Sequence, residues 1–116
     1  MEKIGVLSLT GNGQVYDVME GTTHSVQTEE IETYRTQNGV TKAKVKPVSP
    51  FCQATISFGP GQGTADFQDF KGDVELRLRS GLTALFEDAV IEGRPEADDD
   101  QGTAQVRWVS QSAREY

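Results

Sequence analysis

Hydrophobic side chains recur at every second position in three stretches of the sequence. Val74, Leu76 and Leu78 alternate with charged residues, and the same alternation runs over residues 52–58 and 103–108. Because successive side chains of a strand point to opposite faces, this period predicts three β-strands, each with one face in a core. The core residues predicted from the pattern are Ile56, Phe58, Val74, Leu76, Leu78, Val106 and Trp108.

Turn-forming residues predict two further hairpins. Gly11-Asn12-Gly13 separates an expected strand over residues 3–10 from one over residues 14–20, as a three-residue turn that tolerates positive φ. Ser80-Gly81 begins a second tight hairpin, whose return strand continues or bends over residues 83–91. Short strands separated by turns in this way predict a small antiparallel β-sandwich or barrel.

Residues 21–50 interrupt this regular pattern. They hold few large apolar side chains, and so long a connection in a small domain is either functional or disordered. Asn38-Gly39 is a strong hairpin-turn signal, and residues that favour strands lie on the approach to it. We therefore predict that residues 28–47 form a long β-hairpin that projects from the body of the domain.

Two other segments also lack the strand pattern. In residues 66–70 two Phe side chains lie three positions apart behind an aspartate able to cap, which predicts one short helical turn. Residues 93–101, with their run of three aspartates, are typical of a solvated loop. The predicted fold is one domain over residues 1–116, mostly β, with one short helix and the projecting hairpin.

Composition and charge narrow the function. The chain has 116 residues, 35% of them hydrophobic, so the core is thin, and 18 acidic against 11 basic residues give a net charge of −7. This excess of acidic residues argues against a protein that binds nucleic acid through its phosphates. No apolar stretch approaches the roughly 20 residues of a membrane helix, and residues 1–20 lack the pattern of a signal peptide. We expect modest stability in isolation and a gain from assembly with other copies.

Residues with catalytic or metal-binding chemistry form no recognisable site. The single Cys52 lies in an apolar strand with no nearby base, and the single His24, without a visible partner, is expected at a surface or interface. The glycine-rich residues 59–63 lack the ending of a phosphate-binding loop, and residues 96–100 lack the ligand spacing of a calcium-binding EF-hand. We therefore predict no enzyme, no cofactor and no metal.

Charged residues of opposite sign flank the predicted hairpin turn. Acidic residues at positions 29, 30 and 32 precede the turn, and lysines at positions 42, 44 and 46 follow it. Lysines of this kind protect a solvated edge strand from unwanted pairing. The same two groups also suit complementary patches between identical subunits, and from the residues alone both interpretations stay open.

The order and spacing of several short sequence motifs suggest a family. These motifs are Gly11-Asn12-Gly13, Glu32-Thr33, Asn38-Gly39-Val40, Pro47, Ala54-Thr55-Ile56, the segment 66–70, the segment 88–93 with Pro95-Glu96, and the segment 102–108. Together they cover nearly the whole chain. In this order the chain resembles the tail tube protein family of contractile-tailed bacteriophages, in its short Mu-like form.

The resemblance implies a structural virion protein. Its hexameric rings would stack into the inner tail tube, which conducts double-stranded DNA during ejection without binding it specifically. The implied partners are the tail sheath, tape measure, baseplate and tail-terminator proteins, with no membrane, and the implied location is the virion tail after assembly in the host bacterial cytoplasm. The alternatives are a tube protein of another contractile injection system, such as a tailocin or secretion needle, and a stand-alone β-barrel binding module.

In such a tube, the long hairpin is the element that reaches the neighbouring ring. The expected ring-stacking residues are therefore those of the hairpin strands and turn, namely Glu29, Glu30, Glu32, Tyr34, Asn38, Gly39, Lys42, Lys44 and Lys46.

Overall fold

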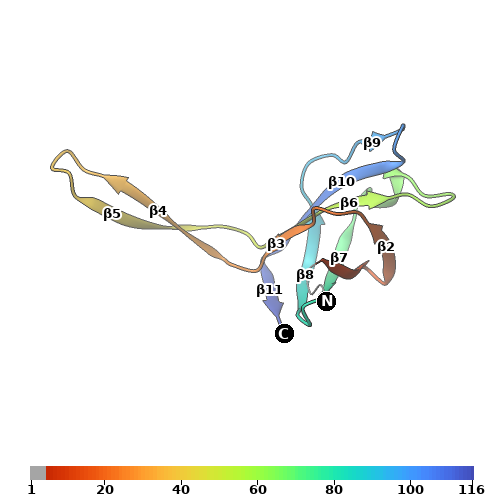
Figure 1. Ribbon diagram of the computed structural model, residues 1–116, viewed down its shortest axis with the longest axis horizontal. Coiled ribbons are helices and arrows are strands. Elements are labelled where there is room, and N and C mark those ends of the chain that lie inside the picture. The colour runs from red at the N-terminus through yellow and green to blue at the C-terminus, as the bar shows by residue number, and fades with distance from the viewer. Residues whose placement is uncertain (1–4) are drawn as a thin grey trace.

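The computed structural model describes residues 5–116 and consists almost entirely of β-strands (Figure 1). The elements are β1 (Val6–Gly11), β2 (Gln14–Val18), β3 (Thr23–Ser25), β4 (Glu29–Arg35), β5 (Thr41–Pro47), β6 (Phe51–Ser57), η1 (Thr64–Phe67), β7 (Lys71–Leu78), β8 (Thr83–Ile91), β9 (Ala97–Asp98), β10 (Thr103–Val109) and β11 (Ser112–Glu115). The predicted fold class is confirmed.

Six antiparallel strands close into a barrel. They follow one another as β7, β1, β2, β6, β10 and β8, and β8 pairs with β10 to complete the circle. Three short strands extend this sheet: β11 pairs with β8, β9 with β10, and β3 with β6. The sequence pattern had left a sandwich and a barrel open, and the pairing of β8 with β10 shows the barrel.

The N-terminal hairpin turns over two residues, not over the three predicted. Gly11 pairs with Gln14, so it is the last residue of β1. Asn12 and Gly13 have φ angles of 54° and 85°. Positive φ at both central residues is typical of a type I′ turn, whose twist matches that of the flanking strands. The first two positions of the expected strand over residues 3–10 lie outside the described residues.

A bulge bends β8 across the barrel. The register of β7 against β8 shifts between Gly72 and Val74. On β8, Asp88 has a positive φ of 50°, and its backbone N–H donates a hydrogen bond of 3.1 Å to Oδ1 of Asp73. The expected bend within residues 83–91 is therefore a single strand with a bulge, which increases local twist and lets β8 reach β10.

The core lies inside the barrel and takes residues from each of its six strands. Among the residues assigned to it from sequence, those at most 1% exposed are Ile56, Val74, Leu76, Val106 and Trp108. Phe58 and Leu78 are partly buried and pack against this core. Alternation missed other fully or nearly buried side chains, which are Leu9, Tyr16, Phe67 and Phe86.

The short helix is a 3-10 turn that begins two residues before the predicted segment. Oδ2 of Asp66 accepts a hydrogen bond of 3.1 Å from the backbone N–H of Gly63, so the aspartate caps from inside the turn. Phe67 is 4% exposed and lies edge-on to Trp108, with 6.2 Å between ring centroids. The helix therefore closes one end of the barrel with an aromatic side chain.

Candidate assembly interface

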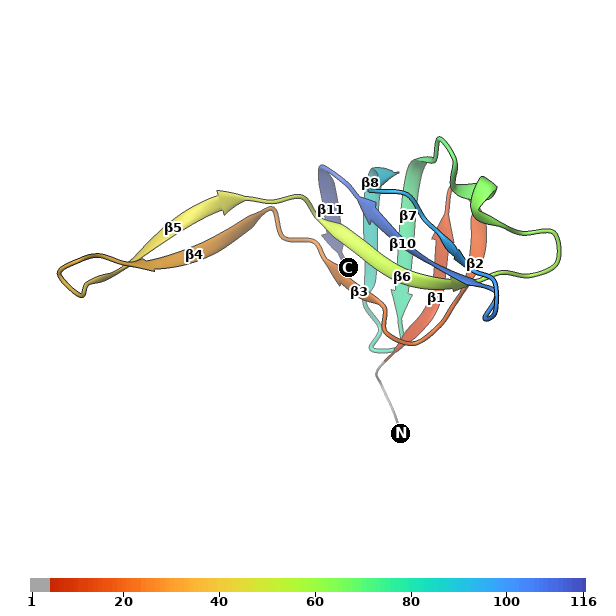
Figure 2. The same ribbon diagram turned by 90° about the horizontal axis from the view of Figure 1, so that it is seen from above.

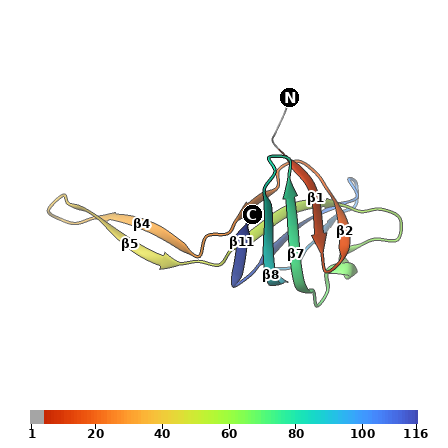
Figure 3. The same ribbon diagram turned by 90° about the horizontal axis from the view of Figure 1, so that it is seen from below.

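The most distinctive feature of the molecule is the hairpin of β4 and β5, which leaves the barrel as a separate sheet (Figures 2 and 3). Every residue of the two strands is exposed, and within the described residues they pair only with each other. The molecule measures 60 × 34 × 27 Å, with a radius of gyration of 16.8 Å. A compact domain of this length has about 13 Å, and the projecting hairpin explains the excess.

The tip of the hairpin is closed by local hydrogen bonds. The backbone N–H of Thr36 donates to the carbonyl of Val40, and the N–H of Gly39 donates to the carbonyl of Thr36, both at 2.9 Å. Gly39 has a φ of 78°, which suits glycine. The turn thus forms at the Asn38-Gly39 signal in the sequence.

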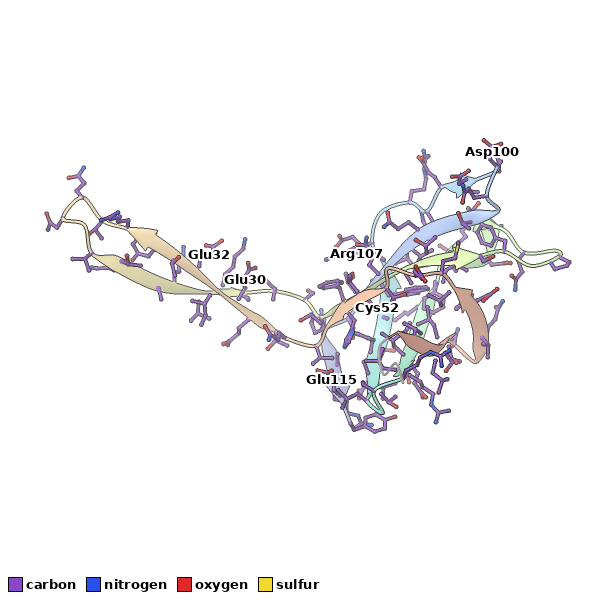
Figure 4. The ribbon with its side chains drawn as sticks, in the orientation of Figure 1. Glu30, Glu32, Cys52, Asp100, Arg107 and Glu115 are labelled. Atoms are coloured by element: carbon purple, nitrogen blue, oxygen red, sulfur yellow. The ribbon has the colours of Figure 1, made fainter. Side chains whose placement is uncertain are left out.

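The two ends of the hairpin are held together where they join the barrel. Ser25 of β3 pairs with Phe51 of β6. Nε2 of His24, on β3, lies 3.3 Å from Oε2 of Glu115 on the C-terminal strand β11, and Figure 4 labels this glutamate beside the root of the hairpin. His24, expected at a surface or interface without a visible partner, thus lies partly buried at this root with Glu115 as its partner, and its ring also meets Phe86 edge-on.

One face of the hairpin carries the charged side chains. Directly opposed residues of an antiparallel pair share a face, and the pairs on this face are Glu30–Lys46, Glu32–Lys44 and Tyr34–Lys42. Nζ of Lys46 lies 3.6 Å from Oε1 of Glu32, and Figure 4 shows Glu30 and Glu32 on the hairpin. Of the groups that suited patches on two different subunits, Glu30 and Glu32 thus lie beside the lysines in one subunit, whereas Glu29 opposes Pro47 on the other face.

The other face of the hairpin carries apolar and small side chains along its middle, with Glu29 and Arg35 at its two ends. Its directly opposed pairs include Ile31–Val45 and Thr33–Ala43. Ile31 is 69% exposed and Val45 is 58% exposed, although both are large and β-branched. We call these four residues the apolar face. The glutamates and lysines around this face dominate the sequence pattern and hide it, although the alternation across residues 29–35 carries the signal.

A second group of exposed apolar side chains lies on the barrel. Leu7 and Val15 are 59% and 66% exposed and line one shallow hollow, and we call them the β1–β2 patch. β1 and β2 pair through residues 9–11 and 14–16, and β2 then turns to β6. Figure 3 shows both strands on the side of the barrel away from the hairpin.

Within residues 5–116, two side chains have clearly shifted pKa values. Burial raises the pKa of the Cys52 thiol to about 12, which keeps it protonated. Burial, and then the charge of Asp66, raise the pKa of Tyr16. Over residues 5–116, no three His, Cys, Asp or Glu side chains are placed to hold a metal ion. In the same part of the chain, no helix is long and apolar enough to cross a membrane.

Comparison with known proteins adds a family and a shared fold. The family model described as phage tail tube protein matches residues 1–115. Among curated proteins, no sequence matches this chain.

Three solved structures share the fold at low sequence identity. The PVC sheath/tube terminator of an extracellular contractile injection system has a TM-score of 0.61 at 12% identity, over 94% of this chain and 91% of that one. A chain of the PVC sheath-tube complex has 0.58 at 14%, over 94% and 86%. Hcp1 from Flavobacterium johnsoniae has 0.52 at 14%, over 97% and 98%.

Proposed function

The chain belongs to the phage tail tube protein family, and we propose that its copies form hexameric rings that stack into the inner tube of a phage tail. The ring number and the stacking come from the family resemblance of the sequence. The projecting hairpin is the observation that supports stacking most strongly. It gives each copy an arm that reaches beyond its own barrel.

The hairpin needs a second surface to be stable. A two-stranded hairpin alone is only marginally stable in water, and every residue of β4 and β5 is exposed. A neighbouring ring supplies such a surface. In this proposal the contact is made by the arm that carries the apolar face and the residues Glu29, Glu30, Glu32, Tyr34, Asn38, Gly39, Lys42, Lys44 and Lys46.

The proposed cargo of the tube is double-stranded DNA during ejection. With a net charge of −7 per chain, the wall of the tube offers DNA phosphates few cations to hold them, so DNA passes without specific binding. The proposed partners around the tube are the sheath and the terminator, which occur with the similar folds described above, and also the tape measure and baseplate proteins. The proposed location is the virion tail, after assembly in the host bacterial cytoplasm.

A second candidate is the tube of another contractile injection system. The two PVC structures favour it, because their fold covers nearly all of this chain. Electron microscopy of particles from producing cells separates the two functions. A tube joined to a DNA-filled head supports the phage tail, and a sheathed tube without a head supports the other machine.

Shortening the hairpin tests the stacking role. Replacing residues 34–44 by a short Gly-Ser turn removes most of the arm and no residue of the core. We expect a folded subunit whose melting temperature is nearly unchanged, because the arm lies outside the barrel, and loss of tube elongation in electron micrographs and sedimentation. Long tubes built by the shortened chain would contradict the proposal, and so would its unfolding.

A further inference from the structure

The two faces of the hairpin differ so much in chemistry that only one of them suits burial. We infer that the apolar face (Ile31, Thr33, Ala43 and Val45), and not the charged face, packs against a second copy of this chain. The inference rests on the proposed tube function and specifies which surface of the arm makes the contact.

The charged face is already satisfied in water. Lys46 and Glu32 form an ion pair within one hairpin, with their side chains 55% and 48% exposed. Moving such charges out of water carries a desolvation penalty that the pair recovers only with very good geometry and further hydrogen bonds. At 3.6 Å, this pair has neither. The charged face therefore favours solvent.

The apolar face has the opposite preference. Ile31 and Val45 oppose each other directly, so together they form a continuous apolar surface. Within the described residues, the two strands that carry them pair only with each other. Association buries such a surface favourably in proportion to its area. No interior packing explains two β-branched residues at these positions, because both are more than half exposed.

A second copy of the chain supplies a matching apolar surface. The strands that carry the β1–β2 patch (Leu7 and Val15) lie on the side of the barrel away from the hairpin (Figure 3). Each copy thus carries one exposed apolar surface on its arm and another on the opposite side of its body. Contact between two different surfaces of identical chains is heterologous and continues from copy to copy, as a stacked tube requires.

The small size of the apolar face limits the strength of a single contact. The apolar face spans three positions on each strand, residues 31–33 and 43–45, which at about 3.4 Å each is a length of about 10 Å. Two strands about 4.8 Å apart then present an apolar area on the order of 100 Å², far below the roughly 1,000 Å² of a stable interface. A single contact is therefore weak, and it forms stably only when many copies assemble together.

Paired substitutions on the two faces test the inference. The variant Ile31→Thr/Val45→Thr keeps β-branched side chains that favour strands but makes the apolar face polar. The matched control Glu32→Gln/Lys46→Gln removes the ion pair from the charged face. We expect the concentration needed for tube assembly, measured by sedimentation, to rise at least about tenfold for the first variant and to stay nearly unchanged for the control. Ile31→Val should assemble as the wild type does.

Chemical labelling in the assembled state gives an answer that does not depend on whether a variant hairpin stays folded. Native Cys52 is fully buried, so a maleimide reports on a cysteine introduced on either face. On assembly, Thr33→Cys should become at least about tenfold slower to label, while Lys44→Cys should change little.

The outcomes separate this inference from the proposed function. A wild-type chain that forms no rings or tubes under any condition overturns both. If the Ile31→Thr/Val45→Thr variant forms tubes as well as the wild type does, the inference is wrong and the tube function stays in place. The same holds if assembly protects Lys44→Cys from labelling instead of Thr33→Cys.

Discussion

Leu76 lies inside the barrel between Leu9 of β1 and Ala84 of β8, and none of its surface is exposed. Removing its branched end leaves a cavity that closely packed neighbours cannot fill. We expect Leu76→Ala to lower the free energy of unfolding by about 2–5 kcal/mol, measured by urea denaturation. Leu7→Ala, at a position 59% exposed, is the control and should change it by less than about 0.5 kcal/mol. Equal effects at the two positions would show that the facing of these strands is wrong.

Cys52 makes stability sensitive to alkali. Its pKa rises from 9.0 to about 12 on folding because the thiol is buried. Above pH 9 the unfolded chain loses this proton while the folded chain keeps it. The free energy of unfolding should therefore be unaffected by this group below pH 9 and should fall as the pH rises from 9 toward 12, by at most about 1.4 kcal/mol per pH unit.

The variant Cys52→Ala isolates this effect. Between pH 9 and pH 10, below the ordinary pKa of 10.0 of Tyr16, the variant should show a flatter dependence of unfolding free energy on pH than the wild type. Identical slopes would mean that the thiol titrates normally in the folded protein. In the wild type at pH 8, iodoacetamide should modify the thiol only after unfolding, because the thiolate is the reactive form.

At the scale of elements, the barrel and the hairpin should differ in local stability. The strands of the barrel surround one core, whereas β4 and β5 have no core beneath them. We expect the backbone amides of β4 and β5 to exchange with solvent far faster than those of β7 and β8 in the free subunit, as measured by NMR hydrogen exchange. In assembled tubes the hairpin amides should become protected. Uniform protection across both parts of the free subunit would contradict this expectation.

The sequence predicts some elements well because local chemistry decides them. Strict alternation gave β6, β7 and β10, and the Asn-Gly signal gave the turn at Gly39. The short strands β3, β9 and β11 were not predicted, because strands of two to four residues form only when a longer neighbour offers an edge. Likewise, the projecting hairpin could be predicted, and alternation along residues 29–35 places Ile31 and Thr33 on one face, but only the strand pairing shows that Val45 lies opposite Ile31.

At the scale of the whole molecule, barrel closure changes the expected reason for assembly. A thin core with free sheet edges would favour association through those edges, but closing the six strands removes most of them. The remaining strands at the margins of the sheet are short, and the long exposed pair is the hairpin. We therefore expect assembly to depend chiefly on an arm outside the barrel, and the barrel itself to be stable before it meets another copy.

The pairing of β3 with β6 also bears on how this protein can evolve. Because Ser25 and Phe51 are neighbours in the sheet, residues 26–50 form an insertion whose two ends lie side by side on the barrel. The entropic free-energy cost of closing such an insertion grows only with the logarithm of its length, by about 0.6 kcal/mol for each doubling. The arm can therefore be lengthened, shortened or exchanged in evolution with little effect on the stability of the barrel, so its length can drift while the barrel stays the same.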